Sequence, residues 1–490
     1  MKLLLIKCFL LTLLISGCDI GPKYERPKTV VDNQSKYNNA HNTLYFTNDP
    51  NNLAKPDKWW HHFNDPVINK YVVGALTENI DLKTKAWQVI VAQEMALQAG
   101  ADRSFSADLT FYGDRSRRAF HSPAGLSTFD ATTYSPMINI NYATDFFGKY
   151  TSTQLNRKAS LHAEYADQRA LYHIIIATVI KSRIRINTLQ QQLENYKESV
   201  INWQKSYDVA SARYRENKAT PSELRSVESS LANAKEKIPN TEQDLIKEMY
   251  VLDTLLGQPA GTTTNPPMTL PMLPNRINDA QTARMSQLLL RPDIIALEQK
   301  IVSNTHAISQ AMATRYPDIN LSFEGGSRSS TFSEMTLDQN RIYSLIFICA
   351  MTLFDSGKTK SHINEMEARA QVTATQYQKG VLDALNEVEK YLVETHYQEM
   401  AYKHLKTQYQ AARAAETFIQ ERYISGLESI LTVLEVGRKR SDVEDIMVIA
   451  QGNIWHTRVD LILALGGHWD IDQMIEQQNK QSIQTITERK

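Results

Sequence analysis

The chain has 490 residues, of which 54 are lysine or arginine and 54 are aspartate or glutamate, so its formal net charge at pH 7 is zero. A protein that binds nucleic acid usually carries a net basic face, so this balance argues against nucleic acid as a partner. After the N-terminus, no apolar run reaches the roughly 18 residues of a membrane-spanning helix. Membrane insertion through short strands that are apolar on one face only remains open.

The N-terminus is typical of an exported protein. Two early lysines precede a short apolar block that ends in "ISGC", and a basic start followed by such a block indicates a secretory signal. Small residues before Cys18 resemble the bacterial lipobox, in which the thiol is acylated and the cysteine becomes the mature N-terminus. We therefore expect residues 1–17 to be a signal peptide and Cys18 to carry lipid. The alternative is a signal cut near Gly17 with an unmodified Cys18.

The next segments predict an arm, helices and a first pair of strands. Residues 18–64 are polar, rich in asparagine and proline, and without a sustained period, so they indicate an extended arm. A helical pattern follows from Asp65. Residues 105–117 and 131–144 then alternate between apolar and polar positions, which predicts a hairpin with one apolar and one polar face.

A very long helix is predicted next, at residues 150–216. No glycine or proline occurs between Lys149 and Pro221. A continuous helix of that length would extend about 100 Å at 1.5 Å per residue. Ordinary globular helices are far shorter, so the pattern favours an extended helical bundle or coiled coil.

A second long helix is predicted at residues 220–257. Thr220 suits the N-cap, Pro221 the first helical position, and Glu223 completes a capping box. Pro239 lies inside this segment, and we expect it to kink or locally break the helix.

The whole arrangement is repeated, because equivalent landmarks are each 209 residues apart. The landmark pairs are Lys149 and Lys358, Arg213 and Arg422, and Gly257 and Gly466. A fixed interval of this kind indicates an internal repeat. The second strands are expected at about 318–328 and 341–354, and the second pair of long helices at about 356–424 and 428–466.

The repeat sets the predicted domain boundaries. We expect a first repeat at 65–262, a linker at 263–280, a second repeat at 281–470 and a polar tail at 471–490. Asn217 and Gly426 occupy equivalent positions between the two long helices of each repeat. Both residue types readily adopt the left-handed conformation, so we expect both positions to be the bends of helical hairpins.

The strands predict an assembly of several copies. Four strands of about ten residues cannot close a barrel alone, and an open sheet would leave two unpaired edges in the bilayer. Three copies would give twelve strands. The predicted fold class is therefore mainly α with a membrane β-barrel: two tandem repeats of a β-hairpin and a long helical hairpin, forming a trimeric 12-stranded barrel on an α-helical coiled-coil tunnel. The third strand would carry Ile319, Leu321 and Phe323 toward lipid, and Asn320, Ser322 and Glu324 toward the lumen.

Ten stretches, in order from Cys18 to Asp470, together resemble the TolC-like outer-membrane efflux factors, in the NodT-type lipoprotein branch that serves resistance-nodulation-division (RND) pumps. They are "GCDIGPKYERP", "WWHHFNDPVINKYVVGAL", "INYATDFFGK", "RYRENKATPSEL", "LDTLLGQP", "LLLRPDIIALE", "MATRYPDINLSF", "LFDSGK", "RYISGLESILTVLE" and "LILALGGHWD". The resemblance implies a homotrimer in the outer membrane with a large periplasmic portion. It also implies contact with outer-membrane lipid, a periplasmic adaptor and an inner-membrane pump of the RND type.

The resemblance also implies a gate at the second helical bend. By motif position, the residues are Leu427, Leu431 and Glu435. A ring of three Leu431 side chains would narrow the bore and exclude water, and a ring of three Glu435 side chains would repel itself or bind cations or an arginine. The alternative is that Leu431 and Glu435 are ordinary helix positions, one buried and one solvated.

The residues beside the bends are candidates for adaptor docking or for ion pairs at the hairpin tips. They are Arg213, Tyr214 and Asn217 in the first repeat, and Arg422, Tyr423 and Gly426 in the second. The alternative is that the arginines at these tips are simply solvated.

No catalytic constellation stands out, so we expect neither enzyme activity nor a cofactor. His61 and His62 could suggest a metal, but adjacent residues do not face each other on a helix and no third ligand has a recognisable spacing. We expect a structural or surface role for them. Cys349 is expected to be buried or lipid-facing. No phosphate-binding loop of the Walker type occurs, so the energy for transport must come from a partner.

Besides the efflux channel that the resemblance implies, two other functions remain open from the sequence. One is the outer-membrane factor of a type I protein secretion system, and the other is a periplasmic coiled-coil lipoprotein without a pore, which explains the alternating segments poorly. Asp19 follows Cys18 directly, and in some Gram-negative bacteria an aspartate there retains a lipoprotein in the inner membrane. Because the strands require their proper bilayer, we expect the outer membrane.

Overall fold

The structure is a computed structural model that describes residues 20–29, 31, 59–63, 65–122, 125–268, 285–466, 475–476 and 479–480. Cys18 and Asp19 lie outside the described residues. The chain divides into two compact units. The first contains the described parts of Met1–Pro27, Gln88–Tyr165 and Ala296–Gln378, and the second those of Lys28–Trp87, Ala166–Ile295 and Lys379–Lys490. Both sequence repeats contribute to both units.

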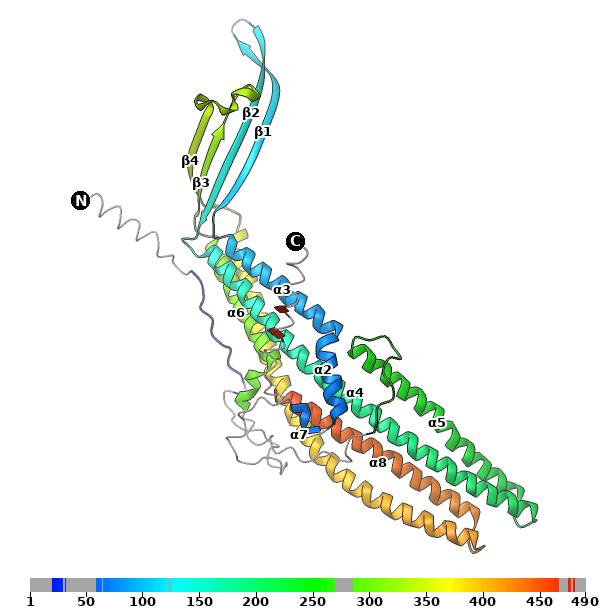
Figure 1. The fold of residues 1–490 in the computed structure, drawn as a ribbon. Helices are drawn as coiled ribbons and strands as arrows, with labels where there is room; N and C mark the ends of the chain where they lie inside the picture. Colours follow the sequence, from blue (N-terminus) through cyan, green and yellow to red (C-terminus); the bar gives the residue numbers. More distant parts are fainter. Residues whose placement is uncertain are drawn as a thin grey trace. The chain divides into compact units, whose positions relative to one another are not determined.

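The first unit contains a four-stranded antiparallel sheet in the order β1-β2-β3-β4 (Figure 1). The strands are β1 (Ser106–Ser122), β2 (Gly125–Thr144), β3 (Asp318–Ser327) and β4 (Arg341–Ala350). Residues paired across antiparallel strands share a face. The register therefore places Leu109 beside Ile138, and Phe323 beside Ile140 and Leu345, on one apolar face.

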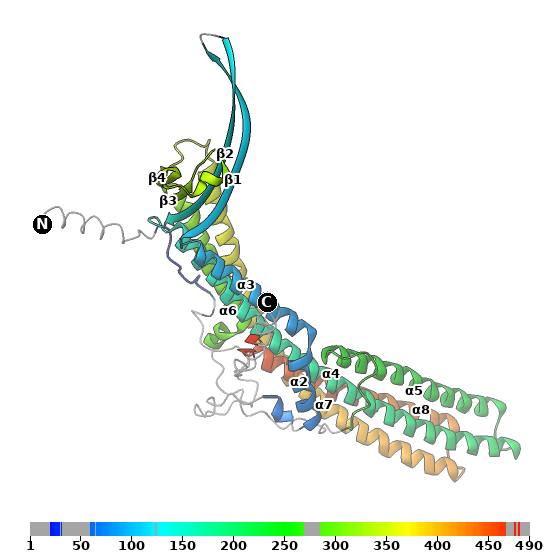
Figure 2. The same cartoon turned by 45° about the horizontal axis from the view of Figure 1, so that its top comes forward.

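The first hairpin is longer than the alternation predicts. Pairing continues as far as Ser122 opposite Gly125, whereas the sequence predicts strands that end at 117 and begin at 131. Alternation stops early because both faces of the outer part carry polar residues, although the backbone ladder continues. Figures 1 and 2 show β1 and β2 extending past β3 and β4. In the second hairpin, β4 ends at Ala350, four residues before the predicted end.

The opposite face of the sheet is polar only in part. Ser322 Oγ donates to Asn141 Oδ1 across β3 and β2 at 2.8 Å. On β4, however, Ile346 and Ile348 stand opposite Ser322 and Asn320. The polar face expected from β3 is therefore apolar at its β4 edge.

The helices of the two repeats have equal lengths. α3 (Ile80–Ala101) and α6 (Pro292–Ala313) have 22 residues, α4 (Lys149–Arg215) and α7 (Lys358–Ile424) have 67, and α5 (Pro221–Leu255) and α8 (Ile430–Ala464) have 35. A short 3-10 turn, η4 (Trp59–Phe63), and α2 (Pro66–Glu78) precede α3. A further 3-10 turn, η5 (Met285–Leu290), precedes α6. None of the helices described here contains a stretch long and apolar enough to cross a membrane.

The start of α5 follows the predicted capping box. Thr220 Oγ1 accepts from Glu223 N at 3.2 Å, and the Glu223 carboxylate accepts from Thr220 N at 2.9 Å. Of the kink or local break expected at Pro239, the break does not occur, because α5 continues through this residue. Proline removes the bond to the carbonyl of Lys235, and both residues are exposed, so solvent can satisfy that carbonyl.

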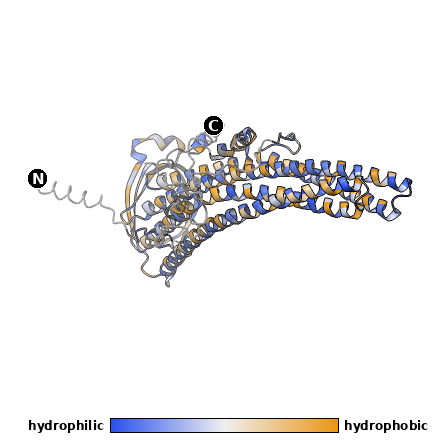
Figure 3. Cartoon of the chain, turned by 90° about the horizontal axis from the view of Figure 1, so that it is seen from below, coloured by the Kyte–Doolittle hydropathy of each residue, from blue (hydrophilic) through white to orange (hydrophobic). Residues whose placement is uncertain are grey.

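In the second unit, α5 and α8 lie beside the adjoining parts of α4 and α7 (Figures 1 and 2). The ribbon of the long helices carries interleaved hydrophobic and hydrophilic positions along its length (Figure 3). The main core combines η4, α2, α4, α5 and α8; Ile176, Ile180, Leu252 and Val459 are buried there, and Phe63 stacks on Trp455 with ring centroids 5.0 Å apart.

The two repeats share a hydrogen bond at the ends of α5 and α8. Asn79, which precedes α3, donates from Nδ2 to Leu255 O at the end of α5 at 2.9 Å. Arg291, which precedes α6, donates from Nη1 to Ala464 O at the end of α8, also at 2.9 Å. The two donors thus occupy equivalent positions in the repeats. Asn79 is neutral, whereas Arg291 also pairs with Glu387 and Asp293 at 2.9 Å each.

Candidate functional site at the helical hairpin turns

The two helical bends have the predicted backbone. Asn217 and Gly426 both adopt the left-handed conformation, with φ of 54° and 78°. In each turn, the amide that follows donates to a carbonyl five residues earlier. The bonds are Lys218 N to Arg213 O at 2.7 Å, and Leu427 N to Arg422 O at 2.8 Å. This is the closing bond expected at a left-handed helix end, so the prediction of two hairpin bends is confirmed.

Arg213 links the two hairpins. Its guanidinium lies 4.9 Å from the ring centroid of Tyr423, and Nη1 donates to Tyr423 O at 3.2 Å. Tyr423 is buried in a second apolar cluster with Trp203, Val227 and Ile430. Burial raises the pKa of the Tyr423 phenol, against the lowering effect of Arg213. Tyr423 therefore packs inside the chain, and its ring is not free to contact a partner.

Arg422 and Tyr214 have more exposed positions. Arg422 lies 5.8 Å from the Phe418 ring centroid and 3.7 Å from the Glu428 carboxylate. All these groups belong to the α7–α8 hairpin. Ion pairs of exposed side chains contribute little to stability. Tyr214 is 41% exposed, so these two residues remain accessible at the tips.

The three residues expected to gate a channel are all exposed, and two of them lie in one row on α8. Leu427 is 65% exposed and Leu431 is 61% exposed, and Glu435 is exposed as well. The step of four residues from Leu431 to Glu435 places these two side chains in one row on a helix face. Leu427 belongs to the turn, because α8 begins at Ile430 behind its N-cap Ser429. The alternative in which Leu431 is buried within the chain is wrong.

A groove that the sequence analysis missed lies beside this row. It has a volume of about 630 Å³ between α4, α5 and α8. Residues from all three helices line it, including Trp203, Ser222, Arg225, Ser226, Leu431 and Arg438. Ser222 is equivalent to Leu431 across the repeats, so the groove brings equivalent positions of the two hairpins together. The serine-rich run "SELRSVESSLAN" is the sequence signal that could have indicated it.

A buried charged cluster joins α7 and α8 farther from the tips. Arg440 contacts the Glu416 carboxylate at 2.9 Å and also pairs with Glu444. Tyr409 donates from its hydroxyl to Glu444 Oε1 at 2.8 Å. Burial raises the pKa of the Glu416 carboxyl, while Arg440 lowers it. Gly437 allows close packing here, because a Cβ would lie 3.0 Å from the Trp203 ring.

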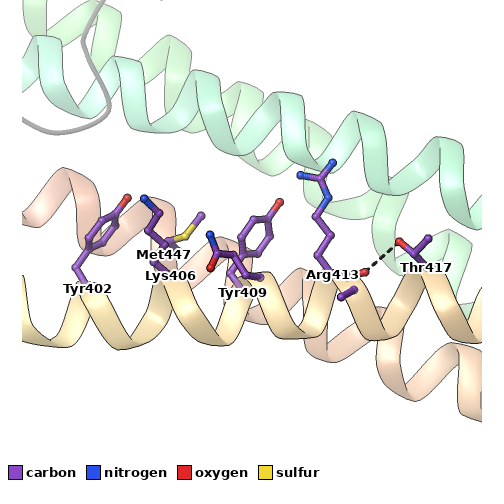
Figure 4. A pocket seen from close by; sticks show the side chains of 8 residues that line it. Tyr402, Lys406, Tyr409, Arg413, Thr417 and Met447 are labelled. Atoms are coloured by element: carbon purple, nitrogen blue, oxygen red, sulfur yellow. Dashed lines mark hydrogen bonds between the residues drawn. The ribbon is translucent and has the colours of Figure 1, made fainter.

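A second pocket, of about 460 Å³, lies beside this cluster. Figure 4 shows Tyr402, Lys406, Tyr409 and Arg413 along one side of α7, with Met447 of α8 behind them. Thr417 donates from Oγ1 to Arg413 O at 3.1 Å. The aromatic rings and cations make this pocket different in character from the serine-lined groove.

The remaining sequence candidates lie apart from the tips. Cys349 is an exposed thiol on β4, so within one chain it is not buried, and its lipid-facing role remains a prediction. His61 is exposed. Within the described ranges, no group of three or more histidine, cysteine, aspartate or glutamate side chains could hold a metal ion.

The start of the arm is fixed to α6. Tyr24 donates from its hydroxyl to Glu298 Oε1 at 2.6 Å. Gly21 packs so closely on Ser309 that a Cβ would lie 2.2 Å from its hydroxyl. The arm begins at Cys18 in the sequence, and the described part that follows it packs on the helix that leads into β3.

Comparisons with known proteins agree with this architecture. The family described as "Outer membrane efflux protein" matches residues 72–258 and 285–467. The pyoverdine export outer membrane protein OpmQ of Pseudomonas putida is 27% identical over 86% of this chain and 90% of its own length. The probable outer membrane lipoprotein SilC of Salmonella typhimurium is 23% identical over 93% of this chain and 97% of its length. The Campylobacter jejuni CmeC outer membrane channel has the same fold, with a TM-score of 0.85 at 18% identity, over 94% of this chain and 98% of that chain.

Proposed function

The chain belongs to the outer membrane efflux protein family, and from this premise we propose that it is the outer-membrane channel of a tripartite efflux system. It lies in the outer membrane and is a transport conduit, not an enzyme. The observation that carries the proposal is one chain that combines a four-stranded sheet with two helical hairpins of matched length. The channel is passive, and an inner-membrane pump supplies the energy.

The protein functions as a homotrimer. Within the described sheet, β1 and β4 are the two edges, and unpaired edges are not tolerated in a bilayer core. Pairing β1 of one protomer with β4 of the next satisfies both edges, and three copies give a twelve-stranded barrel. The helical hairpins of the three copies then enclose a tunnel through the periplasm.

The gate of this tunnel lies at the second hairpin of each protomer. Leu427, Leu431 and Glu435 are exposed, and threefold symmetry repeats each of these side chains as a ring. The leucine rings close the bore by excluding water, as hydrophobic constrictions do in channels. The Glu435 ring concentrates negative charge beside them, which disfavours anions.

A periplasmic adaptor docks at the hairpin tips. Arg213 supports the tips from within, because it links α4 to the Tyr423 end of α7. Tyr214, Arg422 and the groove lined by Ser222 and Ser226 offer exposed polar contacts. An adaptor that ends in helical hairpins could extend this bundle, and it would connect the channel to a pump of the RND class.

Lipid on Cys18 assists anchoring. The described residues shortly after Cys18 pack on α6 through Gly21 and Tyr24. Lipid chains alone anchor weakly unless several act together, whereas a shared barrel holds the protein in the membrane. The lipid therefore has a supporting role in placing the N-terminus.

The transported substrates are small molecules, such as drugs, toxic compounds or metals. Relatives named for small-molecule export, such as the OpmQ protein, support this class over secreted proteins. The test is a deletion strain that is complemented with the wild-type gene. We expect the deletion to increase susceptibility to a panel of drugs and metals, and the purified trimer to conduct in planar lipid bilayers.

Two outcomes would contradict the proposal. One is a purified, heat-modifiable trimer that inserts into bilayers without conducting, which would favour a scaffold without a pore. The other is a deletion strain with unchanged susceptibility that fails to secrete a protein, which would favour type I secretion.

A further inference from the structure

The outer part of the β1–β2 hairpin carries a basic patch on the apolar face of the sheet. Arg115 and Arg117 follow Leu109 and Phe111 on β1 in steps of two residues, and side chains that alternate along a strand share a face at that spacing. Arg115 pairs across the strands with Thr132, and Arg117 with Asp130. Both arginines are exposed.

Aromatic side chains lie immediately below this patch. Phe111 lies 6.5 Å from Tyr134, and Tyr134 lies 6.1 Å from Phe332, measured between ring centroids. Gly113 stands opposite Tyr134, and a Cβ at this position would lie 3.8 Å from the Phe111 ring and 3.9 Å from the Tyr134 ring. Aromatic belts of this kind mark the membrane–water interface of transmembrane strands.

The distances along β2 fit the thickness of a membrane. Thr144 pairs with Ile319 at one end of the apolar face, and Tyr134 lies ten residues away at the other. Ten residues span about 33 Å, which a strand tilt of about 40° reduces to about 25 Å, the height of the apolar band of such proteins. Arg115 and Arg117 therefore lie just beyond the band, at the level of the lipid headgroups.

The arginines at this rim of the sheet differ in whether they have an acidic partner. Arg117 contacts Asp130 at 3.0 Å, and Arg341 at the end of β4 contacts Asp338 at 2.8 Å, with all four side chains more than half exposed. In the part of the chain that the structure describes, Arg115 has no acidic partner within ion-pair distance. Exposed ion pairs are weak, so Arg117 and Arg341 can release their carboxylate partners and bind an anion that has a higher affinity for a guanidinium group.

We propose that Arg115 and Arg117 bind the phosphate groups of the anionic glycolipid that forms the outer leaflet of the outer membrane. Guanidinium groups bind phosphate through paired hydrogen bonds. The inference rests on the proposed function, because it requires the sheet to be inserted in that membrane. It adds a lipid-binding site on the outer surface, away from the tunnel, the gate and the Cys18 anchor.

The test uses the purified full-length trimer and bisphosphorylated lipid A, with fully dephosphorylated lipid A as the reference lipid. Retained lipid is measured by native mass spectrometry. The double variant Arg115→Gln/Arg117→Gln should bind lipid A about 25-fold more weakly, at about fivefold for each arginine near an anionic surface. Asp130→Asn should bind more tightly, because it removes a competing carboxylate. The dephosphorylated lipid should bind all variants equally weakly.

Arg118 provides the matched control, because it lies on the same strand but points to the opposite face. Arg118→Gln should leave lipid A binding within about twofold of wild type, since it lies outside the patch. Three results would overturn the inference. The double variant could bind lipid A as tightly as the wild type does, or Arg118→Gln could lose as much binding as the double variant. The third result is that inorganic phosphate competes for the site as well as lipid A does.

Conductance and heat-modifiability measured on the same samples separate the two proposals. A trimer that conducts while its arginine variants retain lipid A overturns the lipid site only. A chain that forms no channel overturns the proposed function and this inference with it.

Discussion

Among single residues, Leu431 and Glu435 carry the proposed gate. Both are exposed at the start of α8. We expect Leu431→Ala combined with Glu435→Gln to raise the single-channel conductance at least about twofold, because a shorter apolar side chain no longer excludes water from a constriction. Planar bilayer recordings of the purified protein provide the measurement.

The first repeat contains the matched control. Ser222 and Ser226 occupy the positions equivalent to Leu431 and Glu435 and line the neighbouring groove. Replacing both serines with alanine should leave the conductance unchanged. Equal conductance of the wild type and the gate variant would contradict the assignment of the gate.

Arg440 is the residue whose loss should cost the most stability. It is the cation between two carboxylates, of which Glu444 is buried and Glu416 is mostly buried. Removing one partner of a buried ionic cluster costs about 3–5 kcal/mol. We expect Arg440→Met to lower the midpoint of thermal unfolding strongly, whereas Lys439→Met at the exposed neighbouring position should leave it nearly unchanged.

This loss should depend on pH. Burial already raises the pKa of Glu416 above its ordinary value, so its contribution to stability is present at low pH and is lost as the pH rises through the folded-state pKa. Arg440→Met removes the charge that lowers this pKa. The destabilisation should therefore be smaller at pH 5 than at pH 8, and an equal loss at both values would contradict a charge-based role.

At the scale of elements, the equivalent bonds from Asn79 and Arg291 differ in their chemistry. Asn79→Ala removes a neutral donor to Leu255 O and a cap on Leu82 N, which should cost about 1 kcal/mol. Arg291→Ala should cost more, because Glu387 and Asp293 lose their partner as well. Thermal unfolding of both variants measures the difference.

Salt distinguishes the two bonds further. Screening weakens interactions between charges, so the cost of Arg291→Ala should decrease in high salt while that of Asn79→Ala stays constant. Arg291→Lys keeps the charge and should recover part of the stability. The same salt response in both variants would indicate that charge does not matter at Arg291.

Local sequence signals predicted the elements well where the decisive chemistry lies within a few residues. The capping box at Thr220 and Glu223 and the bends at Asn217 and Gly426 are of this kind. The strand pairing beyond residue 117 was missed because side-chain alternation ends before the backbone ladder does. Pro239 does not break α5, because a single lost hydrogen bond at an exposed carbonyl does not end a packed helix.

The candidate site was predictable only in part for a related reason. The motif at the second bend singled out Leu427, Leu431 and Glu435, and all three side chains are exposed. The groove beside Leu431 requires α4, α5 and α8 to pack together, and the charged cluster at Arg440 joins two helices. Those neighbours are far apart in the sequence, so no local pattern contained them.

At the scale of the whole molecule, matched hairpins should be required for function. Deleting seven residues from each of α7 and α8 would shorten one hairpin by about 10 Å and separate Arg213 from Tyr423. We expect this variant to lose complementation of drug susceptibility. Deleting the corresponding residues from α4, α5, α7 and α8 together should restore complementation. Equal complementation by the two deletion variants would contradict a need for matched tips.

The equal helix lengths also restrict how such a chain can change over generations. One inserted residue rotates every later side chain of a helix by about 100° and advances it by about 1.5 Å. The sister helix in the other repeat must then acquire a compensating insertion, or the two tips lose their common level. Substitutions can make equivalent residues such as Ser222 and Leu431 differ, whereas the lengths of the equivalent helices in the two repeats must stay equal.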